Sequence, residues 1–161
     1  MPNVKPVPDH MHTINVYLTV KNAPEAIEWY KKAFNATEHH RSLGPDGKSV
    51  MHCELRVGDS TFMLSDEFPE MSCKSPQTLG GTPMAMFMYV DNVDQVFENV
   101  TKAGAKVTMP LGDMFWGDRY GQVVDPYGHK WGIATHKEDL TPEQVKQRQE
   151  QFMKQTAGTH K

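Results

Sequence analysis

Two stretches of the chain share one design: VKNAPEAIEWYKKAFNAT, from Val20 to Thr37, and VDNVDQVFENVTKAGAK, from Val90 to Lys106. Each stretch follows an apolar segment, Ile14 to Val20 in the first case and Met84 to Val90 in the second. Within each stretch apolar residues recur at helical spacing, which predicts an amphipathic helix with one buried face. The chain therefore contains an internal repeat, and each copy begins with a strand and a helix.

The two predicted helices have the same signals at their ends. Asn22 and Asn92 are each followed three residues later by Glu or Gln, which is the spacing of a capping box at a helix N-terminus. Asn35 and Gly104, which tolerate the left-handed backbone conformation, stand where the helices should end. The repeat therefore extends through both helix ends.

Three strand candidates, separated by turns, follow each helix. The turns contain the Gly, Pro and Asp residues that interrupt strands. The candidates are Ala36 to Leu43, Ser49 to Val57 and Ser60 to Ser65 in the first half, and Ala105 to Leu111, Phe115 to Val124 and Lys130 to His136 in the second. The predicted fold class is α+β, with two tandem βαβββ modules and a C-terminal helix.

This order of elements divides the chain into five segments. We expect an N-terminal arm over 1–12, a first module over 13–66, an inter-module loop over 67–81, a second module over 82–136, and a C-terminal helix and tail over 137–161. The loop is long for a connector, so a binding loop or lid is an alternative to a plain linker. The few apolar residues of the last helix indicate loose docking or contact with a partner subunit.

The composition argues against several classes of function. The 161 residues are 38% hydrophobic and 23% charged, and the formal net charge is -3, so nothing favours nucleic acid as a partner. No apolar run approaches the ~20 residues of a membrane helix, and residues 1–12 do not resemble a signal peptide, so we expect a cytoplasmic protein. Cys53 and Cys73 have no metal-binding or disulfide spacing and are expected to be reduced thiols.

With the repeat established, the chain resembles the glyoxalase, bleomycin resistance and extradiol dioxygenase superfamily, also called the vicinal oxygen chelate superfamily. The resemblance covers about Thr13 to His136. It rests on Val20-Lys21-Asn22, Ala26-Ile27-Glu28-Trp29-Tyr30, Phe34-Asn35-Ala36, Val90-Asp91-Asn92 and Asp125-Pro126-Tyr127-Gly128, and the motifs Gly44-Pro45-Asp46-Gly47 and Phe115 to Gly121 are similar to its PhnB-like branch. The resemblance implies a curved, cup-shaped mixed sheet, a small-molecule ligand and a homodimer.

The resemblance also raises the question of a metal. Metal-dependent members of the superfamily bind a divalent ion with His and Glu side chains from the first and last strands of the two modules. In this chain the corresponding positions are Asn15, Ala85, Gly132 and a residue near Leu64, and Asp66 could supply one ligand at most. Transition ions need three or four protein ligands. The resemblance therefore implies that the usual metal site is missing, and we expect no cofactor.

The histidines outside these positions offer little support for a different metal site. His39 and His40 are neighbours on a predicted strand, so they should point to opposite faces and cannot chelate one ion together. We expect both to be solvated. His10 and His12 belong to a Pro-rich terminal arm that we expect to be poorly ordered, so neither is expected to bind metal.

Acid and base chemistry has three weak candidates. His52 and Glu54 alternate along a strand and either face the cup together or lie on the wetter side of the sheet. Asp66 at the end of the fourth strand is the third candidate. The sequence leaves these alternatives open.

Strand parity predicts which side chains line the cup. The predicted ligand-binding residues are Asn15, Tyr17, Phe62, Leu64, Phe87, Trp116, Arg119 and Tyr120. Within this set Arg119 could hold an anion while Trp116 stacks on a ring. The alternatives are that the aromatic residues fill a closed core, and that Arg119 forms a surface pair with Asp118.

Two functions follow from this sequence. The first is a metal-independent protein that binds a small aromatic or otherwise apolar molecule. The alternative is a glyoxalase-like lyase or isomerase that uses a relocated metal or a metal-free acid and base. A third interpretation, an interaction protein that has lost its cup, would apply if Phe62, Leu64 and Phe87 fill the space.

Overall fold

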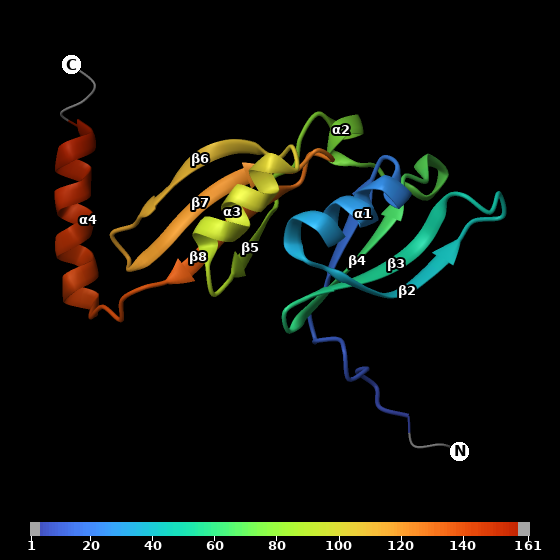
Figure 1. Cartoon of the computed structure of the whole chain (residues 1–161), viewed down its shortest axis with the longest axis horizontal. Coiled ribbons are helices and arrows are strands. Elements are labelled where there is room, and N and C mark those ends of the chain that lie inside the picture. The colour runs from blue at the N-terminus through green and yellow to red at the C-terminus, as the bar shows by residue number, and fades with distance from the viewer. Residues whose placement is uncertain (1–3, 158–161) are drawn as a thin grey trace. The chain divides into compact units, whose positions relative to one another are not determined.

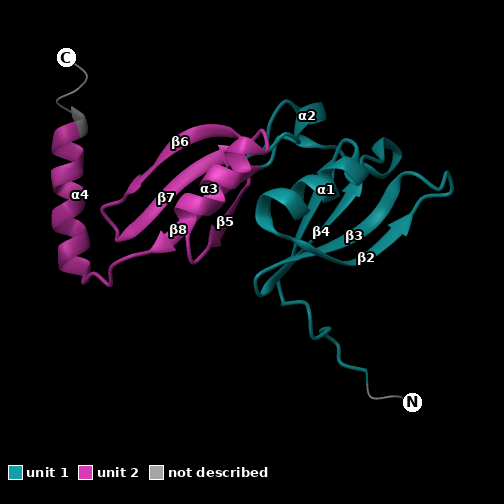
Figure 2. Cartoon of the chain, viewed as in Figure 1, with its two compact units in different colours: residues 1–83, 125–129 teal, residues 84–124, 130–161 magenta. Residues whose placement is uncertain are grey.

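The structure is a computed structural model that describes residues 4–157, so the outermost parts of the predicted arm (1–3) and tail (158–161) lie outside the described residues. The chain divides into two compact units (Figure 2). The first unit takes the residues up to Pro83 together with Asp125–His129, and the second takes Met84–Val124 and the residues from Lys130 onward. The turn over Asp125–His129 therefore belongs with the first unit, although its flanking strands belong to the second.

The first unit is a four-stranded mixed sheet with a helix on one face (Figure 1). Its elements are β1 (Val16–Val20), α1 (Ala23–Phe34), β2 (Thr37–Leu43), β3 (Val50–Val57), β4 (Ser60–Asp66), the 3-10 helix η1 (Pro69–Met71) and α2 (Pro76–Leu79). The strand order is β1-β4-β3-β2, with β1 and β4 parallel and the other pairs antiparallel. This is a βαβββ module.

The second unit repeats the same topology. Its elements are β5 (Ala85–Tyr89), α3 (Val93–Lys102), β6 (Lys106–Asp113), β7 (Asp118–Val124), β8 (Lys130–His136) and α4 (Pro142–Ala157). The strand order is β5-β8-β7-β6, with β5 and β8 parallel. Both the α+β class and the tandem βαβββ arrangement predicted from the sequence are confirmed.

The two main helices begin differently, which corrects half of the capping prediction. Asn92 Oδ1 accepts a hydrogen bond from the Gln95 amide at 3.1 Å and caps α3 as expected. Asn22, in contrast, has a left-handed backbone (φ 59°) and makes no cap. The first amide of α1, that of Ala23, instead donates to Asp66 Oδ1 at 2.7 Å. The cap of α1 therefore comes from the end of β4, which local sequence spacing could not indicate.

The core of the first unit lies between α1 and its sheet. Phe62 and Leu64 are directly opposite Val16 and Leu18 in the parallel β1–β4 pair, so their side chains share the helix-covered face. Both are buried, and the Phe62 ring packs on Tyr30 of α1 with centroids 5.3 Å apart. The predicted ligand-binding roles of Phe62 and Leu64 are therefore wrong. A register error of one residue moves a whole strand to the opposite face.

The turn between β7 and β8 is attached to α1 by a buried polar contact. Tyr30 Oη donates to Asp125 Oδ2 at 2.6 Å, and burial together with the Asp125 carboxylate raises the pKa of this tyrosine well above its ordinary value. Asp125 Oδ1 accepts hydrogen bonds from the amides of Tyr127 and His129, both at 2.9 Å. His129 in turn reaches the Thr19 carbonyl oxygen of β1 at 3.0 Å. These contacts explain why the turn belongs with the first unit.

The predicted inter-module loop is held in place by hydrogen bonds. Glu67 Oε1 accepts from the Ser75 amide at 2.7 Å. Hydrogen bonds from the Thr78 side chain and the Ser75 amide lower the pKa of Glu67 to about 2. The Gln77 side chain donates to the Pro126 carbonyl oxygen at 3.0 Å. The loop is therefore held against the Asp125–His129 turn, and its role as a lid stays a prediction.

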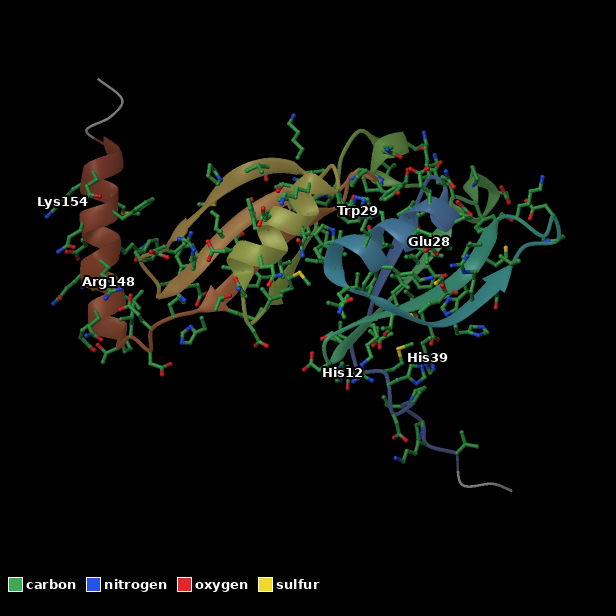
Figure 3. The ribbon with its side chains drawn as sticks, viewed as in Figure 1. His12, Glu28, Trp29, His39, Arg148 and Lys154 are labelled. Atoms are coloured by element: carbon green, nitrogen blue, oxygen red, sulfur yellow. The ribbon has the colours of Figure 1, made fainter. Side chains whose placement is uncertain are left out.

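The C-terminal helix α4 has few contacts with the rest of its unit. Arg148 forms a paired contact with the Glu138 carboxylate at 2.8 and 3.0 Å, and the Phe152 ring lies 5.7 Å from that of Phe115. Arg148 and Lys154 are labelled on this helix in Figure 3. Among the described residues no helix combines the length and the hydropathy needed to span a bilayer.

Candidate functional site

Within residues 4–157 each sheet has one face covered by a helix, α1 or α3, and one face without a helix. We call the face away from α1 the first open face and the face away from α3 the second open face. Strand register places Tyr17, His52, Glu54 and Met63 on the first open face, and Phe87, Tyr120, Gln122 and Gly132 on the second. These positions correspond in order, because Val20 and Val90 are equivalent in the repeat.

A hydrogen-bonded row of polar side chains crosses the first open face. His52 Nε2 lies 3.3 Å from Glu54 Oε1, and His52 Nδ1 lies 3.2 Å from Tyr17 Oη. A carboxylate can only accept, so His52 donates through Nε2, while the Tyr17 hydroxyl lies between two possible acceptors, His52 Nδ1 and the Met51 carbonyl oxygen 3.3 Å away. The structure thus brings His52 and Glu54 together on the open face, beside the predicted ligand-binding residue Tyr17.

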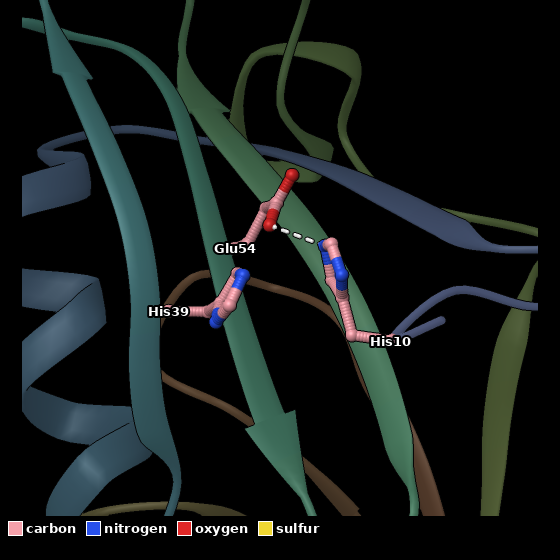
Figure 4. A group of neighbouring side chains, drawn as sticks. All are labelled: His10, His39 and Glu54. Atoms are coloured by element: carbon pink, nitrogen blue, oxygen red, sulfur yellow. Dashed lines mark hydrogen bonds and ion pairs between the residues drawn. The ribbon is translucent and has the colours of Figure 1, made fainter. Parts of the chain in front are cut away.

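Two further imidazoles join this row, which corrects two predictions. A β-bulge between Glu38 and His40 inserts an extra residue, so that His39 also turns toward the open face. His10, expected in a poorly ordered arm, lies 3.1 Å from Glu54 Oε2, and its ring centroid is 4.2 Å from that of His39 (Figure 4). His40 points to the same side, with its ring 6.2 Å from that of His52. His39 and His40 therefore do not point to opposite faces.

The electrostatics of the first open face favour a charged carboxylate. Glu54 is partly buried, which opposes its ionisation, but hydrogen bonds from His52 and His10 outweigh the burial and lower the pKa of Glu54 below its ordinary value. Its two oxygens have separate partners, since Oε1 meets His52 and Oε2 meets His10. Glu54 is therefore an ionised acceptor at neutral pH.

Two residues predicted for this site have structural contacts instead. Asp66 accepts from the Ala23 amide through Oδ1 and from the Val50 amide at 2.8 Å through Oδ2, on the helix side of β4. It is not placed to act as an acid or base with Glu54. Asn15 exchanges hydrogen bonds with the backbone of His12, so its amide closes a turn of the N-terminal arm.

The second open face is aromatic where the first is polar. Phe87 and Tyr120 stack with ring centroids 5.2 Å apart and an interplanar angle of 10°. The two rings meet above Gly132, where an added Cβ would lie 2.8 Å from Tyr120 and 3.1 Å from Phe87. The adjacent Gly121 faces the opposite side, against Phe97 of α3. The stack therefore fills the place of the missing side chain at Gly132.

A buried carboxylate organises the polar end of this face. Asp118 is only 3% exposed. It accepts hydrogen bonds from Tyr89 Oη at 3.0 Å, from Trp116 Nε1 at 2.9 Å and from His136 Nδ1 at 2.8 Å. Hydrogen bonds to Asp139 and Asp118 raise the pKa of His136. Sequence reasoning treated Asp118 as half of a surface pair, although its strand parity with Tyr120 was a usable signal.

Arg119 lies on the wrong face for a ligand-binding role. It alternates with Asp118 and Tyr120 along β7, so it projects toward α3. There its guanidinium contacts Asp94 at 2.7 Å and Asp113 at 3.2 Å, and these carboxylates raise its pKa further. The prediction that Arg119 holds a ligand anion is therefore wrong, while Trp116 and Tyr120 do lie on the second open face.

Residues 9–133 match the Glyoxalase/Bleomycin resistance protein/Dioxygenase superfamily. The chain belongs to this superfamily. An uncharacterized protein of Mycobacterium bovis is 40% identical over 135 residues, which cover 82% of this chain and 88% of the relative.

Solved structures with the fold of this superfamily are similar to the structure of this chain. A PhnB protein of Bacillus cereus has a TM-score of 0.60 and 20% identity, over 77% of this chain and 99% of that one. The fosfomycin resistance protein FosX of Listeria monocytogenes, complexed with Mn(II) and sulfate, has a TM-score of 0.60 and 16% identity, over 83% and 95%. These likenesses support the fold.

The strand register fixes the metal-ligand position of the superfamily that the sequence left uncertain. Gly132 is paired with Phe87 in the second unit. In the first unit Met63 is paired with Tyr17, the equivalent of Phe87, so the remaining position is Met63 rather than Leu64. A methionine thioether is a soft ligand that suits copper(I) rather than the harder divalent ions.

The residues at the superfamily's ligand positions do not suit a divalent ion. Ala85 and Gly132 have no donor atoms in their side chains, and the Asn15 amide is engaged by the arm backbone. A carboxylate at Gly132 would also collide with the stack of Phe87 on Tyr120. Two of these four described positions therefore have side chains without a donor atom.

Proposed function

We propose that the chain is a small-molecule-binding protein that holds an aromatic or apolar ligand on the second open face, without a metal at the superfamily's ligand positions. One observation supports this most directly. The place of a metal-binding carboxylate is occupied by the stacked rings of Phe87 and Tyr120 over Gly132. A flat apolar surface thereby replaces an ion-binding centre.

The exposure of these rings supports a binding role over a closed core. Phe87 is 51% exposed and Tyr89 is 62% exposed, with their ring centroids 5.2 Å apart. Large apolar rings that remain uncovered mark interaction sites. The hydroxyl of Tyr89 and the indole of Trp116 add fixed polar groups at one end, because both donate to Asp118. An apolar surface with a few fixed polar groups is typical of small-molecule sites.

The proposal includes a cytoplasmic homodimer, as expected from the sequence. Phe87 and Tyr89 are both more than half exposed, so this face has room for a second copy to cover part of it. Light scattering of the purified protein measures the mass directly. A monomer at every concentration would remove this part of the proposal and leave ligand binding to be tested separately.

Ligand binding is tested by tryptophan fluorescence. Trp116 lies beside Tyr120, with ring centroids 5.8 Å apart, so a planar aromatic ligand stacked on this face should quench its emission. Phe87→Ala should weaken binding of quinoline or naphthalene carboxylates by about tenfold, corresponding to the ~1–1.5 kcal/mol of one stacking contact. Tyr17→Ala, at the equivalent position of the first unit, is the matched control. Equal effects of the two substitutions would contradict the assignment to the second face.

A second function is favoured by the Tyr17–His52–Glu54 row. An imidazole hydrogen-bonded to a carboxylate on one side and a phenol on the other is an arrangement that can exchange protons with a substrate. On this alternative the chain is a lyase or isomerase of the glyoxalase type. Turnover of hemithioacetal substrates that is lost in His52→Gln, and retained in Phe87→Ala, would favour it over the binding proposal.

A further inference from the structure

We propose that His10, His39 and Glu54 form a binding site for one divalent transition ion, separate from the superfamily's ligand positions. The ligand atoms of these three side chains lie within 4.8 Å of one another. They come from three different segments, namely the N-terminal arm, β2 and β3 (Figure 4). This site does not depend on the proposed ligand-binding function.

The spacing of the ligand atoms is close to that of a coordination shell. Metal–ligand bonds of about 2.0–2.1 Å in a tetrahedron place neighbouring ligand atoms roughly 3.3 Å apart. His10 Nε2 and Glu54 Oε2 already lie 3.1 Å apart. The His39 atom needs to approach by at most about 1.5 Å, because all the ligand atoms lie within 4.8 Å of one another. His39 is exposed, so its ring can rotate to close the shell without moving the core.

The backbone brings these side chains together by specific local devices. The bulge in β2 allows His39 and His40 to share the open face, whereas a regular strand would point one of the two toward α1. The arm turns where the Met11 amide donates to the Pro8 carbonyl oxygen at 3.0 Å, and His12 and Asn15 then exchange hydrogen bonds. His10 is thereby placed against β3 by backbone and side-chain contacts of its own segment.

A supporting group orients the carboxylate. Glu54 has 15% of its side chain exposed, and His52 Nε2 lies 3.3 Å from its second oxygen. His52 is held in turn by Tyr17 Oη. Hydrogen bonds of this kind fix the orientation of metal-ligating carboxylates.

The ligand types indicate which ions would bind. Two imidazoles and one carboxylate suit Zn²⁺, Ni²⁺ or Fe²⁺, whereas Mg²⁺ and Ca²⁺ prefer oxygen ligands. Three protein ligands leave the remaining positions to water or to an anionic ligand. Zn²⁺ is the simplest probe, and Co²⁺ reports the ligand geometry through its visible absorption.

The test uses the full chain after removal of metal with a chelator. Titration calorimetry should show one Zn²⁺ per chain, and Co²⁺ should give the absorption of a low-symmetry site with nitrogen and oxygen ligands. His39→Ala and Glu54→Gln should each weaken Zn²⁺ binding by more than roughly tenfold, the smallest loss expected even for groups that only orient a ligand.

His40→Ala is the matched control. His40 is the sequence neighbour of His39, is exposed and lies on the same face, but its Nε2 is hydrogen-bonded to Ser42 at 3.0 Å. This variant should retain Zn²⁺ affinity. Thermal unfolding without metal verifies that all variants fold.

Three results would overturn the proposal: Zn²⁺ binding of wild type that is not detectable at millimolar concentration, equal losses in His39→Ala and His40→Ala, or unchanged binding in Glu54→Gln. Quenching of Trp116 by aromatic ligands, and its loss in Phe87→Ala, measures the proposed function independently. A failed metal titration would therefore leave that function standing, and the reverse also holds.

Discussion

The two units have the same topology and the same pattern of side-chain contacts, yet opposite chemistry on their open faces. Tyr17 lies beside His52 with ring centroids 5.7 Å apart, and in the equivalent positions Phe87 stacks on Tyr120 at 5.2 Å. His52 is hydrogen-bonded to Glu54, just as Tyr120 is hydrogen-bonded to Gln122. The first face is therefore ionisable and the second aromatic.

The two units share the βαβββ backbone but differ in the side chains on their open faces. Both units have a β-bulge at the same point of their outer strand, before His40 in β2 and before Met109 in β6. The extra residue at the bulge is His39 in one unit and Thr108 in the other. The backbone fixes which positions meet, and the side chains at those positions decide whether the face suits an ion or a ring.

The largest expected effect comes from restoring the superfamily's carboxylate in the second unit. Gly132→Glu requires the Tyr120 ring to move, because a Cβ at this position already lies 2.8 Å from it. We expect the free energy of unfolding to fall by about 3 kcal/mol through overpacking and burial of a charge. Met63, at the equivalent position of the first unit, is only partly buried. Met63→Glu should therefore lower the free energy of unfolding by less. Urea denaturation compares the two, and equal costs would contradict the difference between the faces.

The next largest effect concerns the buried carboxylate that the first unit lacks. Asp118 accepts three hydrogen bonds, while its counterpart in the repeat is the apolar Val50. Asp118→Asn places an amide N–H₂ among donors and should lower the free energy of unfolding by about 2 kcal/mol. Asp113→Asn, which weakens only an exposed pair with Arg119, should cost under about 1 kcal/mol. A smaller loss of unfolding free energy in Asp118→Asn than in Asp113→Asn would contradict this prediction.

A smaller effect distinguishes the starts of the two helices. Asn92→Ala removes the cap of α3 and should lower the free energy of unfolding by about 1 kcal/mol. Asn22→Gly should change it by less than about 0.5 kcal/mol, because the left-handed backbone at this position suits glycine. Thermal melts of both variants provide the comparison. A loss at Asn22 as large as that at Asn92 would mean that Asn22 caps α1 after all.

The smallest effects are opposite pH dependences at equivalent positions, Glu67 after β4 and His136 at the end of β8. The pKa of Glu67 is lowered to about 2, so its contribution is present above its ordinary value of 4.5 and is lost as the pH falls through the folded value. The pKa of His136 is raised from its ordinary 6.5, so its contribution is complete below 6.5 and is lost as the pH rises through the folded value.

Melting temperatures measured from pH 2 to pH 9 test both signs. The melting temperature of Glu67→Gln should approach that of wild type toward acid pH. The melting temperature of His136→Gln should approach that of wild type toward alkaline pH. A His136→Gln penalty that grows as the pH rises would contradict the assignment of its partners.

The sequence predicted the parts of the fold that depend on local signals. The repeat, the superfamily and the bounds of β8, Lys130–His136, follow from periodicity and turn residues. The open-face positions of β4 did not, because Phe62, Met63 and Leu64 are all apolar and give no alternation from which to choose a face. Only pairing with β1 decides that Met63 is the residue on the open face.

The sites were harder to predict because their members meet only through tertiary structure. The bulge that turns His39 has no sequence signature among its polar neighbours Glu38 and His40. His10 approaches Glu54 across 44 residues of chain. Strand parity did place His52 and Glu54 on one face, and it placed Phe87 on the other sheet's open face, because alternation is a local property.

The hydroxyl–carboxylate contact between Tyr30 and Asp125 has a consequence for any attempt to divide this protein at its repeat boundary. A fragment that ends near Pro83 would contain α1 but not the turn that supplies Asp125, so a buried phenol would lose its acceptor. The duplicated halves are thus no longer interchangeable as separate pieces. The first βαβββ module depends on a turn that the second half of the chain supplies.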